Sequence, residues 1–381
     1  MMSDFDAVIP RRGTGSLKWD RRPDLDPFWV ADMDFASPPA VVEALRERVA
    51  HGVFGYPVAH PALVEALVAY LAERHGAQVP ADHLAHLGGL VPALSLAGRA
   101  FAQPGEAMLT ATPVYPPFLG VHRDHNLQLL TTPHVQDGGR WTFDWEHLER
   151  TVTAETRIFL LCHPQNPLGR VFPKEEVVRV AEFCARHDLV LVSDEIHCDL
   201  VLDEEATPFV SALHLPAELL ARTVVLMAPS KTYNIAGLGY SFAVIPDETL
   251  RRKFTQARGH ILPEINCLAF HAAEAAYRHG EAWRQDLLAY LRGNRDLLTD
   301  FVRSRLPGVV VPDIEATYLA WLDFRPAGLE EPAAHFEKQA GLFLSDGRFF
   351  GSPGHARLNF GCPRAALQDA LDRIAGSLAA D

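Results

Sequence analysis

Six short apolar segments follow one another between residues 106 and 245, and several are separated by longer segments with helical periodicity. They are EAMLTA (106–111), LQLLTT (127–132), RIFLLC (157–162), LVLVS (189–193), TVVLMA (223–228) and YSFAVI (240–245). Strands that are apolar throughout are typically buried on both faces, and alternation with helices is typical of a parallel sheet. The sequence therefore predicts an α/β fold with a mostly parallel sheet covered by helices.

The segment 173–188 is predicted to be one of the covering helices. It begins with Pro173, and Glu175 and Glu176 follow near the positive end of the helix dipole. Two further amphipathic helices are expected at 37–52 and 61–76, because each is entered through proline and closed by glycine.

A different pattern follows residue 275. A long helix is predicted at 281–305, and strands are predicted at 317–324, 341–345 and 356–360 as part of a separate α+β unit. We therefore expect a large domain at 49–275 and a smaller α+β domain at 276–381, to which residues 1–48 also contribute.

Composition excludes several classes of protein. The formal net charge of −13 would repel nucleic acid and acidic membranes, so we expect neither as a partner. The five cysteines are odd in number and form no CxxC pair, which argues against a disulfide framework or a structural zinc site and favours reduced thiols. No segment approaches the roughly 18 apolar residues of a membrane helix, and the first residues lack the apolar core of a signal peptide. We expect a cytoplasmic protein.

Reactive side chains follow the predicted strands, where ligands of open α/β sheets bind. The strand 189–193 leads into Asp194, Glu195, His197 and Cys198. Lys231 follows the strand 223–228 and, if desolvated, would have the neutral amine that a Schiff base requires. Two interpretations without a catalytic role remain open at this point. Asp194 could cap a turn, and Lys231 could be a solvated surface charge.

Two other segments could contact a ligand. Asn166 lies between two prolines in CHPQNPLGR, which reads equally well as a turn. Gly88 and Gly89 precede a predicted helix, so free backbone N–H groups would meet a helix dipole there, although paired glycines are only a weak sign of phosphate binding.

Taken together, these motifs resemble a known family. In order the chain carries FGYP, GGLVPAL, TPVYPPF, HPQNPLGR, SDEIH, APSKTYNIAGL and ARLNF, which resembles the fold-type I pyridoxal-phosphate enzymes of the class I/II aminotransferase superfamily over nearly the whole chain. FWVADMDF (28–35), SDEIHCDL and TYLAW look like the MalY/PatB-type branch of cystathionine β-lyases and other cysteine-S-conjugate C–S lyases. The resemblance implies the fold of that superfamily, with a seven-stranded sheet in the large domain.

The resemblance also implies a role for individual residues in binding the cofactor pyridoxal 5′-phosphate. Lys231 would form the Schiff base, and Asp194 would pair with the pyridine nitrogen and keep it protonated. Asn166 would bind the ring's phenolic oxygen, His197 would lie near the same side and Tyr115 would stack on the ring.

The phosphate and the substrate have implied partners as well. Backbone N–H groups of Gly89 and Leu90 and the hydroxyl of Ser230 would bind the phosphate. Tyr56 would reach the phosphate of the neighbouring subunit and take part in catalysis, which implies a homodimer with shared active sites. A small amino-acid substrate would be bound by Arg357 and Asp32, with no metal.

The implied reaction is elimination of a thiol from cystathionine or another cysteine S-conjugate, leaving pyruvate and ammonia. An aminotransferase acting on a small or aromatic amino acid is the alternative, because both reactions begin with loss of the α-proton. A metal-dependent hydrolase using Asp194, Glu195, His197 and Cys198 lacks an HExxH-like spacing, and a non-catalytic regulator is a fourth hypothesis.

Three departures from the family pattern affect these expectations. Gln165 replaces a common His, Gly88 replaces a common Pro, and Gly239 stands where aminotransferases often have a phosphate-binding Arg. The loop FFGSPGHARLNF (349–360) is also about two residues shorter than usual, which would reshape the entrance for the substrate and admit a bulkier cysteine conjugate.

Overall fold

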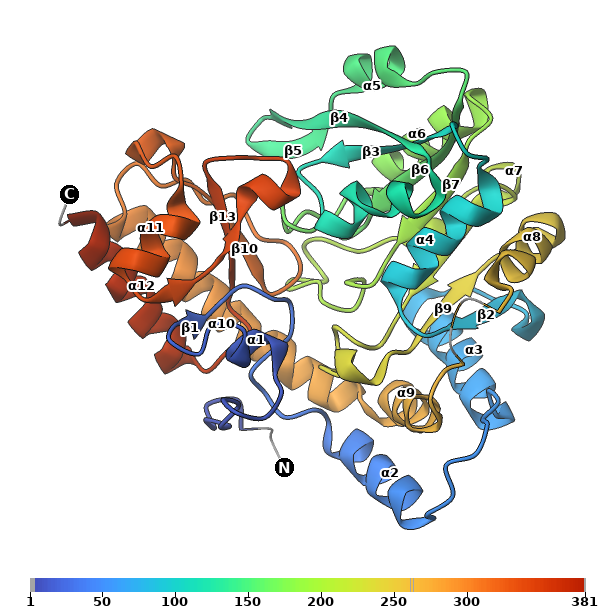
Figure 1. Ribbon diagram of the computed structural model, residues 1–381, viewed down its shortest axis with the longest axis horizontal. Coiled ribbons are helices and arrows are strands. Elements are labelled where there is room, and N and C mark those ends of the chain that lie inside the picture. Colours follow the sequence, from blue (N-terminus) through green and yellow to red (C-terminus); the bar gives the residue numbers. More distant parts are fainter. Residues whose placement is uncertain (1–3, 261, 263, 380–381) are drawn as a thin grey trace.

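The computed structural model of the protein describes residues 4–260, 262 and 264–379, and an eight-stranded sheet forms its centre (Figure 1). In spatial order the strands are β2 (Leu84–Leu87), β9 (Ser241–Val244), β8 (Thr223–Met227), β7 (Val190–Asp194), β6 (Thr156–Cys162), β3 (Ala107–Thr112), β4 (Gln128–Asp137) and β5 (Arg140–Phe143). The run from β8 to β4 is parallel, whereas β2, β9 and β5 pair antiparallel with their neighbours. The predicted mostly parallel sheet is confirmed, and β5 extends it by one strand beyond the expected seven.

Both faces of this sheet are buried, as the continuously apolar strands predict. In β6, Ile158 and Leu160 face one core while Phe159 and Leu161 face the other, because successive side chains of a strand point to opposite faces. Helices α4 (Leu90–Phe101) and α8 (Glu248–Arg258) cover the first face. Helices α3 (Pro61–His75), α6 (Lys174–Arg186) and α9 (Cys267–His279) cover the second, with the short helices α5 (Trp145–Thr151) and α7 (Ala217–Leu220) nearby.

The segment that contains α1 (Leu17–Asp20) and β1 (Asp26–Pro27), blue in Figure 1, packs beside the C-terminal part of the chain, orange to red. A three-stranded antiparallel sheet has the order β10 (Leu319–Asp323), β13 (His355–Asn359), β12 (Ser345–Asp346). Strand β1 (Asp26–Pro27) pairs parallel with β11 (Leu342–Phe343), and one core joins Phe5, Phe28 and Met33 to residues of α10 (Glu281–Arg305) and α12 (Arg364–Ala379).

The remaining helices are α1 (Leu17–Asp20), α2 (Pro39–Ala50), which packs on α9, and α11 (Pro332–Gln339). Helices α2, α3, α6 and α10 lie where the sequence predicts them, and α10 matches the predicted range 281–305. The division into domains at residues 48 and 275 stays a prediction. Among the described residues, no helix combines the length and the apolar character needed to cross a membrane.

Candidate active site

A cavity of about 270 Å³ lies where β6, β7 and β8 end and α4 begins. This position matches the general rule that ligands of open α/β sheets bind beyond the carboxyl ends of the strands. Residues predicted from the sequence that line the cavity are Gly89, Leu90, Tyr115, Asn166, Asp194, His197, Ser230 and Lys231. The structure thus brings together predicted residues that are up to 142 positions apart in the chain, from Gly89 to Lys231.

Lys231 presents its amine to this cavity from the turn that follows β8. Its Nζ donates a hydrogen bond to the backbone oxygen of Ala31, 2.7 Å away. Burial, together with the positive charge of Arg357, lowers the pKa of Lys231 to about 8, although Asp32 and Asp194 oppose this shift. At neutral pH a usable fraction of the amine is therefore neutral, which a nucleophilic lysine requires.

Asp194 closes β7 and is almost completely buried. One carboxylate oxygen accepts a hydrogen bond from the backbone N–H of Ile196 at 3.1 Å. Burial raises the pKa of Asp194 to about 7, against the opposing effects of that hydrogen bond and of Lys231. A buried carboxylate in this state is stabilised by a cationic partner in the cavity.

His197 is neutral beside the same cavity. Burial, with Lys231 and Arg357 nearby, lowers its pKa to about 3. Its Nδ1 is buried and has no hydrogen-bond partner among the described residues. An orphaned polar atom at a cavity wall is a candidate contact for a bound group.

Arg357 enters the site from β13 of the smaller sheet. Its Nη1 donates to Oδ1 of Asn166 at 3.0 Å, and its Nη2 donates to the backbone oxygen of Trp29 at 2.6 Å, while its Nε is buried without a partner. Burial lowers the pKa of Arg357 to about 10, so the guanidinium remains charged at neutral pH. A charged, oriented guanidinium suits a carboxylate ligand.

The glycines at the start of α4 form an open backbone cradle. Gly89 has φ 149° and immediately precedes Leu90, the first residue of the helix, so N–H groups of the first turn and the positive end of the helix dipole face the cavity. Gly239 has φ 64°, and a Cβ built there would lie 3.1 Å from the backbone oxygen of Gly88. Glycine therefore suits this position, because the backbone is left-handed and a Cβ would make a tight contact with Gly88.

The cavity fits pyridoxal phosphate in three respects. A helix N-terminus with free N–H groups is suited to an anion, a buried carboxyl with a pKa near 7 is suited to a cationic ring nitrogen, and a lysine with a lowered pKa is suited to an aldehyde. Gly89, Leu90 and Ser230 would hold the phosphate. The ring would be held by Asp194, Asn166, His197 and Tyr115, and Lys231 would bind the aldehyde carbon.

Three predicted site residues are not among those that line this cavity: Arg357, which lines an adjoining cavity, Tyr56 and Asp32. Tyr56 is fully exposed in the segment between α2 and α3, so the structure does not bring it to the site of its own chain. The carboxylate of Asp32 is paired with Arg11 at 2.7 Å, and Asp32 does not line the cavity, although its neighbour Ala31 does. The roles of Tyr56 and Asp32 stay predictions.

The four residues of the metal-hydrolase hypothesis do not converge. Glu195 turns away, and its Oε1 accepts hydrogen bonds from Ser193 Oγ at 2.9 Å and from Ala212 N–H at 2.8 Å. Among the described residues, the groups whose ligand atoms lie within 4.8 Å of one another are His60 with His271 and Glu274, and His75 with Cys198 and Asp199. Neither group includes Asp194 or His197.

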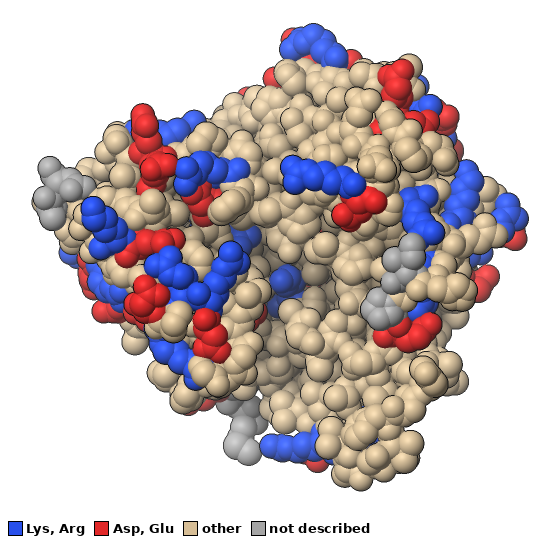
Figure 2. Space-filling model, viewed as in Figure 1, with Lys and Arg blue, Asp and Glu red and all other residues tan. Residues whose placement is uncertain are grey.

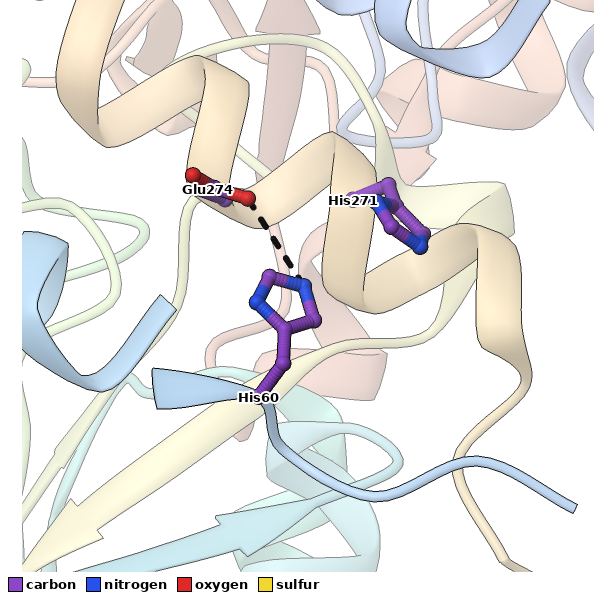
Figure 3. Close-up of side chains that lie close together, drawn as sticks. All are labelled: His60, His271 and Glu274. Atoms are coloured by element: carbon purple, nitrogen blue, oxygen red, sulfur yellow. Dashed lines mark ion pairs between the residues drawn. The ribbon is translucent and has the colours of Figure 1, made fainter. Parts of the chain in front are cut away.

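Figure 3 shows the His60 group, in which the imidazole of His60 faces Glu274 and His271 lies beside it on α9. His60 Nδ1 accepts from the backbone N–H of Leu63 at 3.3 Å, which caps α3. The proton of a neutral ring therefore sits on Nε2, the atom that faces Glu274 at 3.7 Å. That nitrogen has no lone pair free for a metal while the cap is in place.

Some residues of the site were not predicted. Ala31, Cys162, Ile196 and Tyr240 also line the cavity. A second cavity of about 640 Å³ adjoins the first and shares Ala31, Tyr115 and Lys231 with it. Its lining includes Trp29, Phe343, Phe349, Phe350 and Arg357. The signal available in the sequence was FWVADMDF, which contains both Trp29 and Ala31.

Known proteins resemble this chain over almost its whole length. The chain is 38% identical over 388 residues to "Cystathionine beta-lyase PatB" of Bacillus subtilis (strain 168), covering 98% of this chain and 100% of the relative. The crystal structure of OvoB superposes with a TM-score of 0.96 at 40% identity, covering 99% of this chain and 100% of the other. A PLP-bound C-S lyase from Staphylococcus hominis superposes with a TM-score of 0.88 at 31% identity, covering 98% of each chain. The model of the aminotransferase class I and II family matches residues 28–374, and the chain belongs to that family.

Proposed function

We propose that the protein is a pyridoxal-phosphate-dependent carbon–sulfur β-lyase that converts a cysteine S-conjugate into a thiol, pyruvate and ammonia. The observation that carries this proposal is the convergence of the Lys231 amine, the buried Asp194 carboxylate and the Arg357 guanidinium around two joined cavities. The relatives named cystathionine beta-lyase and C-S lyase support this reaction over others of the family.

Each of the three side chains has a distinct task. Arg357 binds the substrate α-carboxylate and so holds the α-carbon near Lys231, since both residues line the larger cavity. Lys231, with its pKa of about 8, takes the α-proton on Nζ as a general base. Asp194 keeps a negative charge beside the ring nitrogen. Bound pyridoxal phosphate supplies the electron sink that makes the α-proton acidic.

The balance of the elimination is simple. The α-proton passes to Lys231, the Cβ–S bond breaks, and the thiolate leaves with that bond's electron pair. The three-carbon enamine that remains is hydrolysed by water to pyruvate and ammonia. No external oxidant, reductant or acceptor is consumed.

The proposal includes a homodimer and a cytoplasmic location. Tyr56 supports the dimer, because it is fully exposed in its own chain within an apolar segment that also exposes Val53, Phe54 and Val58. A second copy of the chain would cover this segment and place Tyr56 at the neighbouring phosphate. The five cysteines support the reducing cytoplasm, because all are free thiols and four of them are buried.

The test is pyruvate release by purified protein that has been saturated with pyridoxal phosphate. We expect pyruvate and an equal amount of thiol from S-methyl-L-cysteine or L-cystathionine with no keto acid added, and we expect Lys231→Ala to abolish both the turnover and the visible absorption of the bound cofactor. Keto-acid formation that depends on an added acceptor keto acid would instead establish an aminotransferase.

A further inference from the structure

We propose that the larger cavity selects a cysteine S-conjugate whose sulfur carries a planar aromatic group ending in a carboxylate. This inference rests on the proposed lyase function and names the class of its substrate. Four features carry it: the position of the cavity, its size, its aromatic walls and an exposed arginine at its rim that has no carboxylate partner in the described part of the chain.

The position of the cavity assigns it to the sulfur substituent. It shares Ala31, Tyr115 and Lys231 with the smaller cavity and is also lined by Arg357. A substrate held through its α-carboxylate by Arg357, with its α-carbon near Lys231, would direct the group on its β-carbon into the remaining space. In the space-filling view, a hollow near the centre has basic side chains inside it and charged side chains on its left margin (Figure 2).

The size of the cavity exceeds what a small thiol needs. Its volume is about 640 Å³, within the roughly 300–1,000 Å³ of pockets that bind drug-sized ligands. A methylthio group would leave most of this space to water. An aromatic substituent would fill it and remove apolar surface from water at roughly 25 cal/mol per Å².

Aromatic side chains form much of the wall. Trp29 and Phe343 lie with ring centroids 5.0 Å apart, and Phe350 lies under the guanidinium of Arg357 at 4.8 Å. Phe349 also lines the cavity, yet it is 68% exposed and makes no ring contact in the described parts of the chain. A large exposed ring at a cavity mouth is available to stack on a planar ligand.

The charges at the rim favour an anionic end on that ligand. Arg348 is paired with Asp346 at 2.6 Å and with Glu331 at 2.7 Å, and Glu337 is paired with Arg22 at 2.8 Å. Arg21 is different, because its guanidinium lies 5.0 Å from the centre of the Trp29 ring and no ion pair joins it to a carboxylate of residues 4–260, 262 or 264–379. The acids of the rim are thus neutralised, and Arg21 remains to bind a carboxylate.

The test compares three substrates whose leaving thiols are closely alike: S-benzyl-L-cysteine, S-(4-carboxybenzyl)-L-cysteine and S-(4-aminomethylbenzyl)-L-cysteine. The enzyme with bound cofactor should show the highest kcat/KM for the carboxybenzyl compound, by about fivefold over the benzyl compound, and the lowest for the aminomethyl compound, since an exposed ion pair contributes up to about 1 kcal/mol. Added salt should shrink this preference because it screens an exposed pair.

Variants test separately the contribution of the Arg21 charge and that of the Phe349 ring. Arg21→Gln should remove the carboxylate preference, whereas Arg150→Gln, which removes an equally positive but remote side chain of α5, should retain it. Phe349→Ala should lower kcat/KM for all three benzyl substrates by a larger factor than for S-methyl-L-cysteine, whose substituent is too small to stack on this ring. A wild-type enzyme that processes the benzyl and carboxybenzyl compounds equally, or an unchanged preference in Arg21→Gln, would overturn the inference. Continued pyruvate release from S-methyl-L-cysteine in that case would leave the lyase function standing, whereas failure with every thioether would remove both.

Discussion

Nη1 of Arg357 lies 3.0 Å from Oδ1 of Asn166, so a residue of the small antiparallel sheet is hydrogen-bonded to a residue of the loop after β6. The two residues are separated by 191 positions in the chain. Asn166 lines the cofactor cavity and Arg357 lines the substrate cavity. This bond therefore fixes the position of Arg357, the proposed carboxylate-binding residue, relative to the cofactor cavity.

Arg357→Lys should reduce kcat/KM on the order of 100-fold, because an ammonium cannot bind Asn166 and form a bidentate pair with a carboxylate at the same time. The steady-state rate of pyruvate formation measures this effect, and the visible absorbance of the bound cofactor serves as the control, since it should be unchanged. A loss of less than threefold would show that another group binds the carboxylate.

The cofactor should bind covalently faster as the pH rises. The pKa of Lys231 is lowered to about 8, chiefly by burial, and only the neutral amine attacks an aldehyde. The rate constant for adding pyridoxal phosphate to cofactor-free enzyme should therefore rise about tenfold per pH unit below 8 and level off above it. Stopped-flow absorbance measures this profile, and a midpoint above 10 would mean that the amine is solvated.

The stability of the cofactor-free protein should fall as the pH rises from 5 to 8. Burial raises the pKa of Glu195 to about 7, so the folded state holds a proton that the unfolded state releases above about pH 4.5. A raised carboxyl pKa stabilises the fold fully below the unfolded pKa, and this contribution is lost as the pH passes the folded pKa. For Glu195 the loss amounts to about 3 kcal/mol.

Glu195→Gln should flatten this decline, because an amide of the same shape does not titrate and can still accept from Ser193 and Ala212. Urea unfolding at pH 5, 6, 7 and 8 provides the measurement. Asp194, whose pKa is also raised to about 7, remains in the variant, so part of the slope should persist. If the free energy of unfolding falls equally with pH in the wild type and in Glu195→Gln, a group other than Glu195 is responsible for the decline.

Gly239→Ala should weaken cofactor binding and cost about 1–2 kcal/mol of stability, because the residue has a left-handed backbone and a Cβ would press on Gly88 of the phosphate cradle. Gly237→Ala is the matched control two residues away, since an added Cβ there meets nothing within 4 Å. Fluorescence titration of cofactor-free protein with pyridoxal phosphate compares the two. Equal affinities of the two variants for pyridoxal phosphate would show that Gly239 does not contribute to the phosphate cradle.

Mixed dimers test the proposed sharing of active sites. If Tyr56 acts on the neighbouring subunit, co-refolding Tyr56→Ala with Lys231→Ala should produce a dimer in which one site contains both defects and the other contains neither. Activity should then return to about half of the wild-type value per mixed dimer, although each variant alone is impaired. Absence of any recovery would assign Tyr56 to its own subunit or to no site.

Much of the fold could be predicted because its strands carry a strong local pattern. The strands β3, β6, β7, β8 and β9 are short, apolar and followed by turns, and the structure has each within two residues of its predicted range. Strands β2 (LAHL) and β5 (RWTF) were missed. Each is only four residues long, contains at least one polar residue and is partly exposed at an edge of the sheet, where burial no longer dictates an apolar run.

The residues of the active site also fall into those that the sequence could predict and those that it could not. Residues that follow a buried strand, such as Asp194 and Lys231, could be located because the carboxyl ends of parallel strands meet at one edge. The larger cavity could not be predicted from the sequence. Its residues Arg21, Trp29 and Phe349 come from opposite ends of the chain and meet only when β1 pairs with β11. No periodicity in the sequence records that contact.

The pairing of β1 with β11 determines when the site can form during synthesis on the ribosome. Residues 26–27 wait for residues 342–343 before they can form their strand, and Ala31, which holds the Lys231 amine, is anchored by the same segment. The segment around residue 26 is made early but cannot pair before residues 342–343 have been made, so a shorter polypeptide lacks one wall of the reaction chamber. We expect such a polypeptide to be inactive.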